Sequence, residues 1–337
     1  MGIMVLITWI TIGVALTFAG GLLFTNALEY IGGRSRIGES FVGAIISPIF
    51  TSTPELIVFA VALYLYGGES GQDIGIGTVM GEPFMISTVV FPLIFLFVFI
   101  GKFLGTRDDV VLEVNKELII PYLLFTALYP TILLPALISS VIVKWTVALL
   151  LILTYIIYVK IMYSFQGLAI EDYEEPYLSL VVNIHGYRHA LAFTQVVLAL
   201  ITLIIGSRLM VHAIDEAARL LSIDALSLTI VVVPLATVLP ESITAVIWVL
   251  KNRDTMAVAA LVGEKVLYST IYPALGLLLT HWRLTLGALV SVIMVEVISI
   301  IIIYHIVRRR LTPDVAILGL IGYVVYVMLV FHLIIPY

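Results

Sequence analysis

One eight-residue pattern, P-x-x-T-x-x-P-E, occurs twice in the chain, at residues 48–55 and again 186 residues later at 234–241. Its defining residues are Pro48, Thr51, Pro54 and Glu55 in the first copy and Pro234, Thr237, Pro240 and Glu241 in the second. Proline removes a backbone donor and clashes with the carbonyl one turn earlier, so two prolines six residues apart predict an opened helix. The freed carbonyls, a hydroxyl and a carboxylate would form an all-oxygen site suited to a hard cation such as Ca²⁺ or Na⁺.

Both copies lie well inside long apolar segments, where a glutamate is costly. A charged side chain at the centre of a bilayer costs about 2.5–3.5 kcal/mol on insertion scales. Simple packing kinks at the prolines are the structural alternative, but two copies that each end in a glutamate argue against it. Glu55 and Glu241 are therefore predicted to serve a cation in mid-membrane.

A second repeated element follows each copy, because Gly81-Glu82 is matched by Gly263-Glu264. If Glu82 and Glu264 also reach the site, four carboxylates converge there. One or more of the four must then be protonated, bound to metal or paired with a cation. A packing or interfacial role remains the alternative for Glu82 and Glu264.

Lys265 is the only basic residue deep in a predicted membrane span. It could form a structural salt bridge with Glu82 or with Glu296. Alternatively, its ammonium group could stand where a monovalent ion would otherwise bind. Glu296 is accordingly a candidate counter-ion of Lys265 or a proton relay.

The composition indicates an integral membrane protein. Of the 337 residues, 62% are hydrophobic and 12% are charged, and the mean hydropathy is +1.18. Soluble domains are closer to half apolar and a quarter charged. The net charge of −5 argues against a nucleic-acid partner, and the absence of cysteine excludes disulfides and thiolate chemistry. No nucleophile, zinc-protease or nucleotide-binding motif is present, which argues against an enzyme.

Apolar runs predict an all-α polytopic membrane protein with about ten transmembrane helices. The predicted spans are residues 3–28, 39–66, 76–100, 118–137, 139–164, 189–213, 225–250, 256–280, 284–307 and 315–335. A polar connection at 165–188 divides the chain into a first five-helix repeat, 1–164, and a second, 189–337. Because each half has five helices, an odd number, the second half enters the membrane from the opposite side, and the second repeat must be inverted. The proline pattern predicts that helices 2 and 7 are broken.

The positions of lysine and arginine predict the orientation. With the N-terminus outside, twelve of them fall on cytoplasmic connections and four on external ones. This bias predicts that both termini are extracytoplasmic in a multi-pass protein of the cell membrane.

The two copies resemble the calcium/cation antiporter superfamily, which includes sodium/calcium and calcium/proton exchangers. Residues 51–55 (T-S-T-P-E) and 237–241 (T-V-L-P-E) are similar to its G-T-S-x-P-E-like segments. Residues 73–83 look like its D-I-A-x-G-N-x-x-G-S-N segment, and residues 257–265 resemble the same segment more weakly. The resemblance implies ten helices in two inverted halves.

By the same resemblance, Glu55 and Glu241 ligate a divalent metal ion, and Thr51 and Thr237 assist. Where the family commonly has Ser-Asn, however, this chain has Glu82-Pro83 and Glu264-Lys265. Small oxygen donors are thus replaced, which argues against classical three-sodium coupling and makes proton coupling an equal candidate.

The expected function is a secondary antiporter that exchanges a divalent cation, with Ca²⁺ as first choice, for Na⁺ or H⁺ by alternating access. Helices 1 and 6 would slide against helices 2, 3, 7 and 8. The alternatives are a cation channel, a proton-coupled exchanger for another divalent or monovalent cation, and an intramembrane enzyme with paired carboxylates. The expected partners are the lipid bilayer and the transported cations, with no resident cofactor, and the sequence leaves the oligomeric state open.

Overall fold

Helices make up nearly all of the computed structural model, which describes residues 2–32, 47–164, 175–181 and 187–331. Up to residue 164 the helical elements are α1 (Ile3–Gly32), α3 (Ser47–Thr51), α4 (Thr53–Ala60), the π-helical turn η2 (Val61–Tyr66), α5 (Gly68–Met85), the π-helical turn η3 (Ile86–Val90), α6 (Phe91–Phe103), the 3-10 turn η4 (Lys116–Leu118), α7 (Ile119–Leu128), the 3-10 turn η5 (Tyr129–Leu133), α8 (Leu134–Ile138) and α9 (Val141–Ser164). The later helices are α10 (Tyr177–Val181), α11 (Arg188–Leu221), α12 (Ala225–Leu250), α13 (Asp254–Tyr268), α14 (Ile271–Leu279), α15 (Leu286–Val307) and α16 (Asp314–Val330).

The distribution of side chains is that of a polytopic helical membrane protein. Within the described residues, seven helices are long and apolar enough to cross a membrane, and two shorter apolar helices cover 225–238 and 314–330. Large apolar side chains such as Leu149 and Ile293 are exposed, whereas Glu82 and Lys265 are completely buried. This arrangement suits lipid outside and polar chemistry inside. Most of the predicted polar connection lies outside the described residues, and its described part includes α10.

The predicted break in helix 2 is present. The helix is interrupted at Ser52, between α3 and α4, and Pro54 occupies the first turn of α4. Pro54 has no amide hydrogen to donate to the preceding turn. The Ser52 hydroxyl donates to the carbonyl oxygen of Pro48 at 2.6 Å, which also accepts from the Ser52 amide at 3.1 Å.

The predicted break in helix 7 is wrong for the backbone, because α12 runs without interruption from residue 225 to residue 250. A proline removes one backbone hydrogen bond, but its φ is compatible with a helix. Neighbouring helices can support such a site in a membrane protein. Here α5 packs closely against α12 at Gly81, since a Cβ added there would lie 2.6 Å from Cγ of Pro234.

Helix 8 is the second broken helix, which the sequence did not predict. It divides at Ser269 and Thr270 into α13 and α14. Pro273, in the first turn of α14, cannot donate to the carbonyl of Ser269, which explains the break. The corresponding Pro92 in the other half follows the π-helical turn η3, and the helix continues there.

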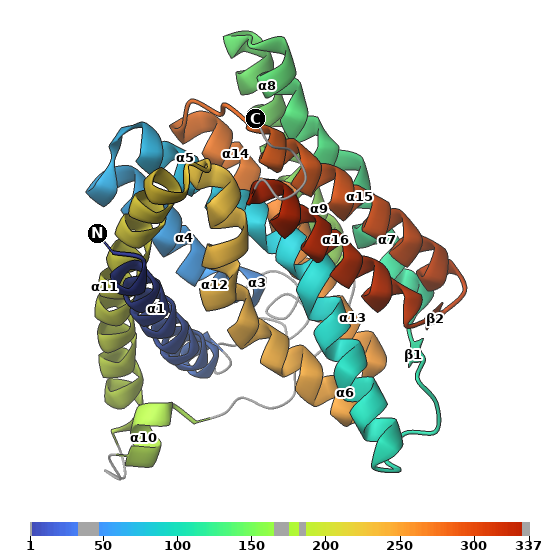
Figure 1. The fold of residues 1–337 in the computed structure, drawn as a ribbon. Coiled ribbons are helices and arrows are strands. Elements are labelled where there is room, and N and C mark those ends of the chain that lie inside the picture. Colours follow the sequence, from blue (N-terminus) through green and yellow to red (C-terminus); the bar gives the residue numbers. More distant parts are fainter. Residues whose placement is uncertain (1, 33–46, 165–174, 182–186, 332–337) are drawn as a thin grey trace.

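The helices α1 and α11 pack along each other at one side of the molecule, and α9, α15 and α7 lie on the other side (Figure 1). The backbones of α1 and α11 touch closely at Gly206, where an added Cβ would lie 2.6 Å from the amide nitrogen of Thr17. Small residues permit such contacts between membrane helices. The two helices that are predicted to move, α1 and α11, therefore pack with their backbones in close contact.

A buried ion pair joins segments that lie far apart in the sequence. The guanidinium of Arg107, which follows α6, donates to both carboxylate oxygens of Asp254 at 2.8 and 2.7 Å. The two side chains are only 5% and 8% exposed. The amide of Glu113 also donates to Asp254 at 3.0 Å. Glu113 belongs to strand β1 (Leu112–Glu113), which pairs antiparallel with β2 (Arg310–Leu311).

Replacing Asp254 by Asn should destabilise the protein strongly, because the Arg107 charge would remain buried without its partner. The expected loss is about 3–5 kcal/mol, measured as the free energy of unfolding in detergent. Asp108→Asn alters an exposed carboxylate in the same loop and should change that free energy by less than about 0.5 kcal/mol. Equal effects of the two substitutions would contradict a structural role for the Arg107–Asp254 pair.

Candidate functional site

The first predicted site residue, Glu55, lies in the opening turn of α4, directly after the break in helix 2. Its side chain is 1% exposed. Neither of its carboxylate oxygens accepts a hydrogen bond from the described residues. The hydroxyl of Thr237, from the second P-x-x-T-x-x-P-E copy, is close enough to interact with this carboxylate, but its geometry does not meet the criteria for a hydrogen bond.

Glu82 lies on α5, and its side chain is completely buried. Both of its carboxylate oxygens are also without a hydrogen bond from the described residues. Glycines position this side chain, because Gly81 and Gly77 let α5 approach α12 closely. The position of Glu82 is therefore set by the contact between the two halves of the chain.

Glu264 connects the two repeated motifs directly. It lies on α13 with 5% of its side chain exposed, and its Oε1 accepts a hydrogen bond from Thr51 Oγ1 at 3.3 Å. The Glu264 charge acts on both Glu55 and Glu82, and Glu55 also acts on Glu82. The structure thus brings together Glu55, Glu82 and Glu264, which we call the carboxylate group.

The carboxylate group does not form a compact metal cage as it stands. Among the described residues, no three acidic, histidine or cysteine side chains lie close enough together to hold a metal ion. The backbone of Glu241 belongs to α12, but its side chain and that of Pro240 lie outside the described part of the structure. The predicted pairing of Glu55 with Glu241 therefore stays a prediction.

Ser52 and Tyr272 also belong to the site, although the sequence did not single them out. The Tyr272 hydroxyl lies 2.7 Å from the Ser52 carbonyl oxygen and 2.8 Å from its Oγ. The Tyr272 ring stacks on Tyr268 with the centroids 4.4 Å apart. Tyr272 precedes Pro273 as Phe91 precedes Pro92 in the first half, and this repeated aromatic-proline pair was the available signal. The break in helix 2 is thus bonded to the element after the break in helix 8.

Lys265 does not form the salt bridge that was one of its predicted roles. Neither Glu82 nor Glu296 lies within 4 Å of it as an ion-pair partner, although both charges act on it. Its Nζ contacts hydroxyl groups instead, at Ser87 and Tyr122. Glu296 lies on α15 and is partly buried.

The sequence of the chain matches the family described as "Sodium/calcium exchanger protein" over residues 5–164 and 191–332. The chain belongs to this family.

Several solved structures share the fold of this family member. The "H+/Ca2+ Exchanger CAX" is 15% identical and has a TM-score of 0.74, over 97% of this chain and 84% of that one. The sodium-calcium exchanger NCX_Mj is 19% identical with a TM-score of 0.59, over 97% and 98% of the two chains. Native YfkE is 16% identical with a TM-score of 0.66, over 97% and 91%. No curated protein matches the chain significantly in sequence.

Membership of the exchanger family assigns the chain to membrane ion transport and not to the enzymes. The expectation of a transporter is therefore confirmed, and the buried acids need no catalytic explanation. Under this assignment, the carboxylate group is the natural place to consider a cation.

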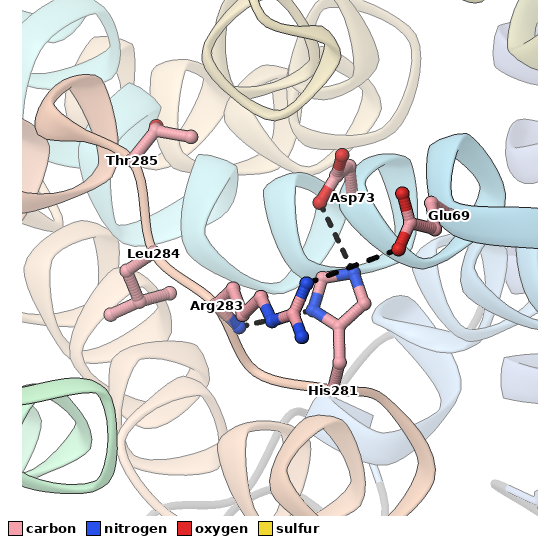
Figure 2. Close-up of a pocket in the computed structure, with 6 residues that line it drawn as sticks. All are labelled: Glu69, Asp73, His281, Arg283, Leu284 and Thr285. Atoms are coloured by element: carbon pink, nitrogen blue, oxygen red, sulfur yellow. Dashed lines mark hydrogen bonds and ion pairs between the residues drawn. The ribbon is translucent and has the colours of Figure 1, made fainter. Parts of the chain in front are cut away.

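The exchanger also has a polar pocket of about 210 Å³ at the beginning of α5. In Figure 2, Asp73 and Glu69 of α5 face His281 and Arg283 from the segment between α14 and α15. His281 Nε2 lies 3.4 Å from Asp73, and Arg283 lies 3.9 Å from Glu69. Asp73 is nine residues from Glu82, about 14 Å along a helix, so this pocket is separate from the carboxylate group.

The surroundings of His281 disfavour its protonated form. Burial lowers the pKa of His281 below its ordinary value, and the positive charge of Arg283 lowers it further. Lys144 acts in the same direction, whereas Glu69 opposes it. An unfolded histidine binds its proton near pH 6.5, so acid favours the unfolded chain over the folded one.

We expect the stabilising effect of neutral His281 to be present above about pH 6.5 and to be lost as the pH falls below it. His281→Gln should remove this dependence, so the midpoint of thermal unfolding should fall less between neutral and acidic pH than in the unsubstituted protein. His189→Gln, at an exposed histidine, should keep the original dependence. A steeper acid loss in His281→Gln would contradict the assignment.

Proposed function

We propose that this chain is a secondary antiporter that exchanges a divalent cation, with Ca²⁺ as the first candidate, for Na⁺ or H⁺ by alternating access. The observation that carries the proposal is the carboxylate group, buried where the broken helix 2 meets α5 and α13. Buried negative charges of this kind require a cation or a proton. A transported ion that enters and leaves would meet this requirement.

The available ligands suit a hard cation. Glu55 and Glu82 have oxygens without hydrogen bonds from the described residues, and Thr51 and Thr237 place hydroxyls beside the carboxylates. Calcium takes six to eight oxygen ligands in flexible geometry, whereas magnesium demands a strict octahedron. A group of carboxylates from separate helices favours calcium, and a bound divalent ion would draw these oxygens together.

The named functions of the structural neighbours support the same cargo with either counter-ion. CAX is an H⁺/Ca²⁺ exchanger, and NCX_Mj is a sodium-calcium exchanger. Glu82 and Glu264 could carry protons as the counter-ion, and the hydroxyls near them could ligate sodium. The proposal therefore includes both forms of coupling, which a flux experiment separates.

The proposed architecture is two inverted five-helix repeats, 1–164 and 189–337, joined by the polar connection 165–188. Both termini would lie outside the cell membrane, and the ten spans would place the two P-x-x-T-x-x-P-E copies antiparallel. Glu241 would then face Glu55 as the second ligand of the divalent ion. The Thr51–Glu264 hydrogen bond supports this arrangement, because it links a first-half motif to the second half.

Alternating access would come from the α1–α11 pair sliding against α4, α5, α12 and α13. The close backbone contact at Gly206 supports a pair that moves as one unit. Such motion would expose the carboxylate group first to one side of the membrane and then to the other.

Glu55→Gln and Glu241→Gln should each abolish counter-ion-driven ⁴⁵Ca²⁺ uptake into proteoliposomes. The expected loss is at least about tenfold, since an ionic ligand of a buried cation contributes more than about 1.4 kcal/mol. Uptake is measured under an imposed Na⁺ gradient and, separately, under an imposed pH gradient. The gradient that drives uptake identifies the counter-ion.

Glu117→Gln serves as the matched control, because Glu117 is an exposed glutamate outside the carboxylate group, and its uptake should remain unchanged. Uptake at the original rate in both site variants would remove the proposal. Ca²⁺ flux that needs neither gradient would identify a channel instead of an antiporter.

A further inference from the structure

Neutral hydroxyl groups surround the ammonium group of Lys265, and we call these surroundings, formed by Ser87, Tyr122 and Ser299, the chamber. The side chain is completely buried. Its Nζ lies 2.8 Å from Ser87 Oγ, 3.2 Å from the Tyr122 hydroxyl and 3.5 Å from Ser299 Oγ. The three hydroxyls come from η3, α7 and α15, so three separate elements converge on one ammonium group.

Aromatic rings complete the surroundings of the ammonium group. Nζ lies 5.1 Å from the centroid of the Tyr122 ring and 4.7 Å from that of Phe125. Cations within about 6 Å of an aromatic face are attracted by its quadrupole. The chamber thus has three neutral oxygens and two ring faces, and an ammonium group has three N–H donors to match the oxygens.

No acidic side chain among the described residues forms a close ion pair with Lys265. Glu82 and Glu296 act on it electrostatically, but neither forms an ion pair within 4 Å. Glu82 belongs to the carboxylate group, so Lys265 supplies positive charge to the region where buried acids need it. The hydroxyl ligands of Lys265 are uncharged, so they do not neutralise its positive charge.

The neutral ligands also determine which cation could bind in the chamber if residue 265 had a shorter side chain. Hydroxyl oxygens are hard donors, which bind hard cations. No carboxylate of the described residues is in direct contact with them, so they provide little compensation for a divalent charge. The chamber therefore matches a monovalent cation in both charge and donor type.

We infer that Lys265 is a tethered monovalent cation: its ammonium group permanently occupies a hydroxyl-lined subsite formed by Ser87, Tyr122 and Ser299. It supplies a charge that an exchanger with an open subsite would take from solution. The inference rests on the proposed antiport function. It means that this protein moves one fewer monovalent ion per divalent cation than it would with the subsite open.

Lys265→Ser should open the subsite and add a fourth hydroxyl. In proteoliposomes with the membrane potential clamped, the potential at which net ⁴⁵Ca²⁺ flux stops gives the number of monovalent ions exchanged per Ca²⁺. That number should rise by one in Lys265→Ser and stay unchanged in Lys265→Arg, which keeps the charge. An unchanged number in Lys265→Ser would overturn the inference.

A second measurement does not depend on transport. In detergent, NaCl should raise the midpoint of thermal unfolding of Lys265→Ser above that in choline chloride of equal ionic strength, because a ligand of the native state stabilises it. The rise should be smaller in the unsubstituted protein and in Lys160→Ser, at an exposed lysine, because the Lys265 ammonium group occupies the subsite in both. An equal sodium-dependent rise in Lys265→Ser and in the unsubstituted protein would also overturn the inference.

The two proposals fail in different ways. Unsubstituted protein without counter-ion-driven Ca²⁺ flux would remove the antiport function, whereas the sodium-dependent stabilisation would still report on the subsite. Normal antiport with neither change in Lys265→Ser would leave the antiport function intact and assign Lys265 to packing alone.

Discussion

Buried carboxylates inside a membrane-spanning bundle set the constraint on which the other features depend. Water cannot solvate them there, and mutual repulsion adds to the cost when several lie together. Glu55, Glu82 and Glu264 are all buried and act on one another. The surrounding protein must therefore supply hydroxyls, opened backbone or positive charge, and each of these is present around the carboxylate group.

Helix breaks next to proline occur at two places, and hydrogen bonds between the two halves of the chain hold the one at Ser52. The break at Ser52 receives the Tyr272 hydroxyl, while Thr51 bonds to Glu264. A helix break inside a membrane is tolerated only where polar partners cover it. The break at Ser52 is thus stabilised by the other half of the chain, whereas the Thr270 hydroxyl at the break in helix 8 donates to Val266 of its own helix.

Two connections between helices are held by ionic contacts of different strength. The Arg107–Asp254 pair fastens one connection by bidentate hydrogen bonds. His281 and Arg283 face Asp73 and Glu69 at another connection, with longer contacts of 3.4 and 3.9 Å. A short buried pair resists separation more strongly than long exposed ones. Separating the Arg107–Asp254 pair should therefore cost more free energy than separating the contacts of the His281 pocket.

The sequence by itself determined the class of the protein, the positions of most helices and the burial of Glu55, because hydropathy and proline act locally. The predicted span 225–250 has the same bounds as α12. Two features needed the tertiary structure: α12 stays continuous through Pro234, and Lys265 bonds to hydroxyls instead of a carboxylate. Both depend on which helices meet. Gly81 packs against Pro234, and the ligands of Lys265 come from elements more than thirty residues away, so packing between distant segments decided them.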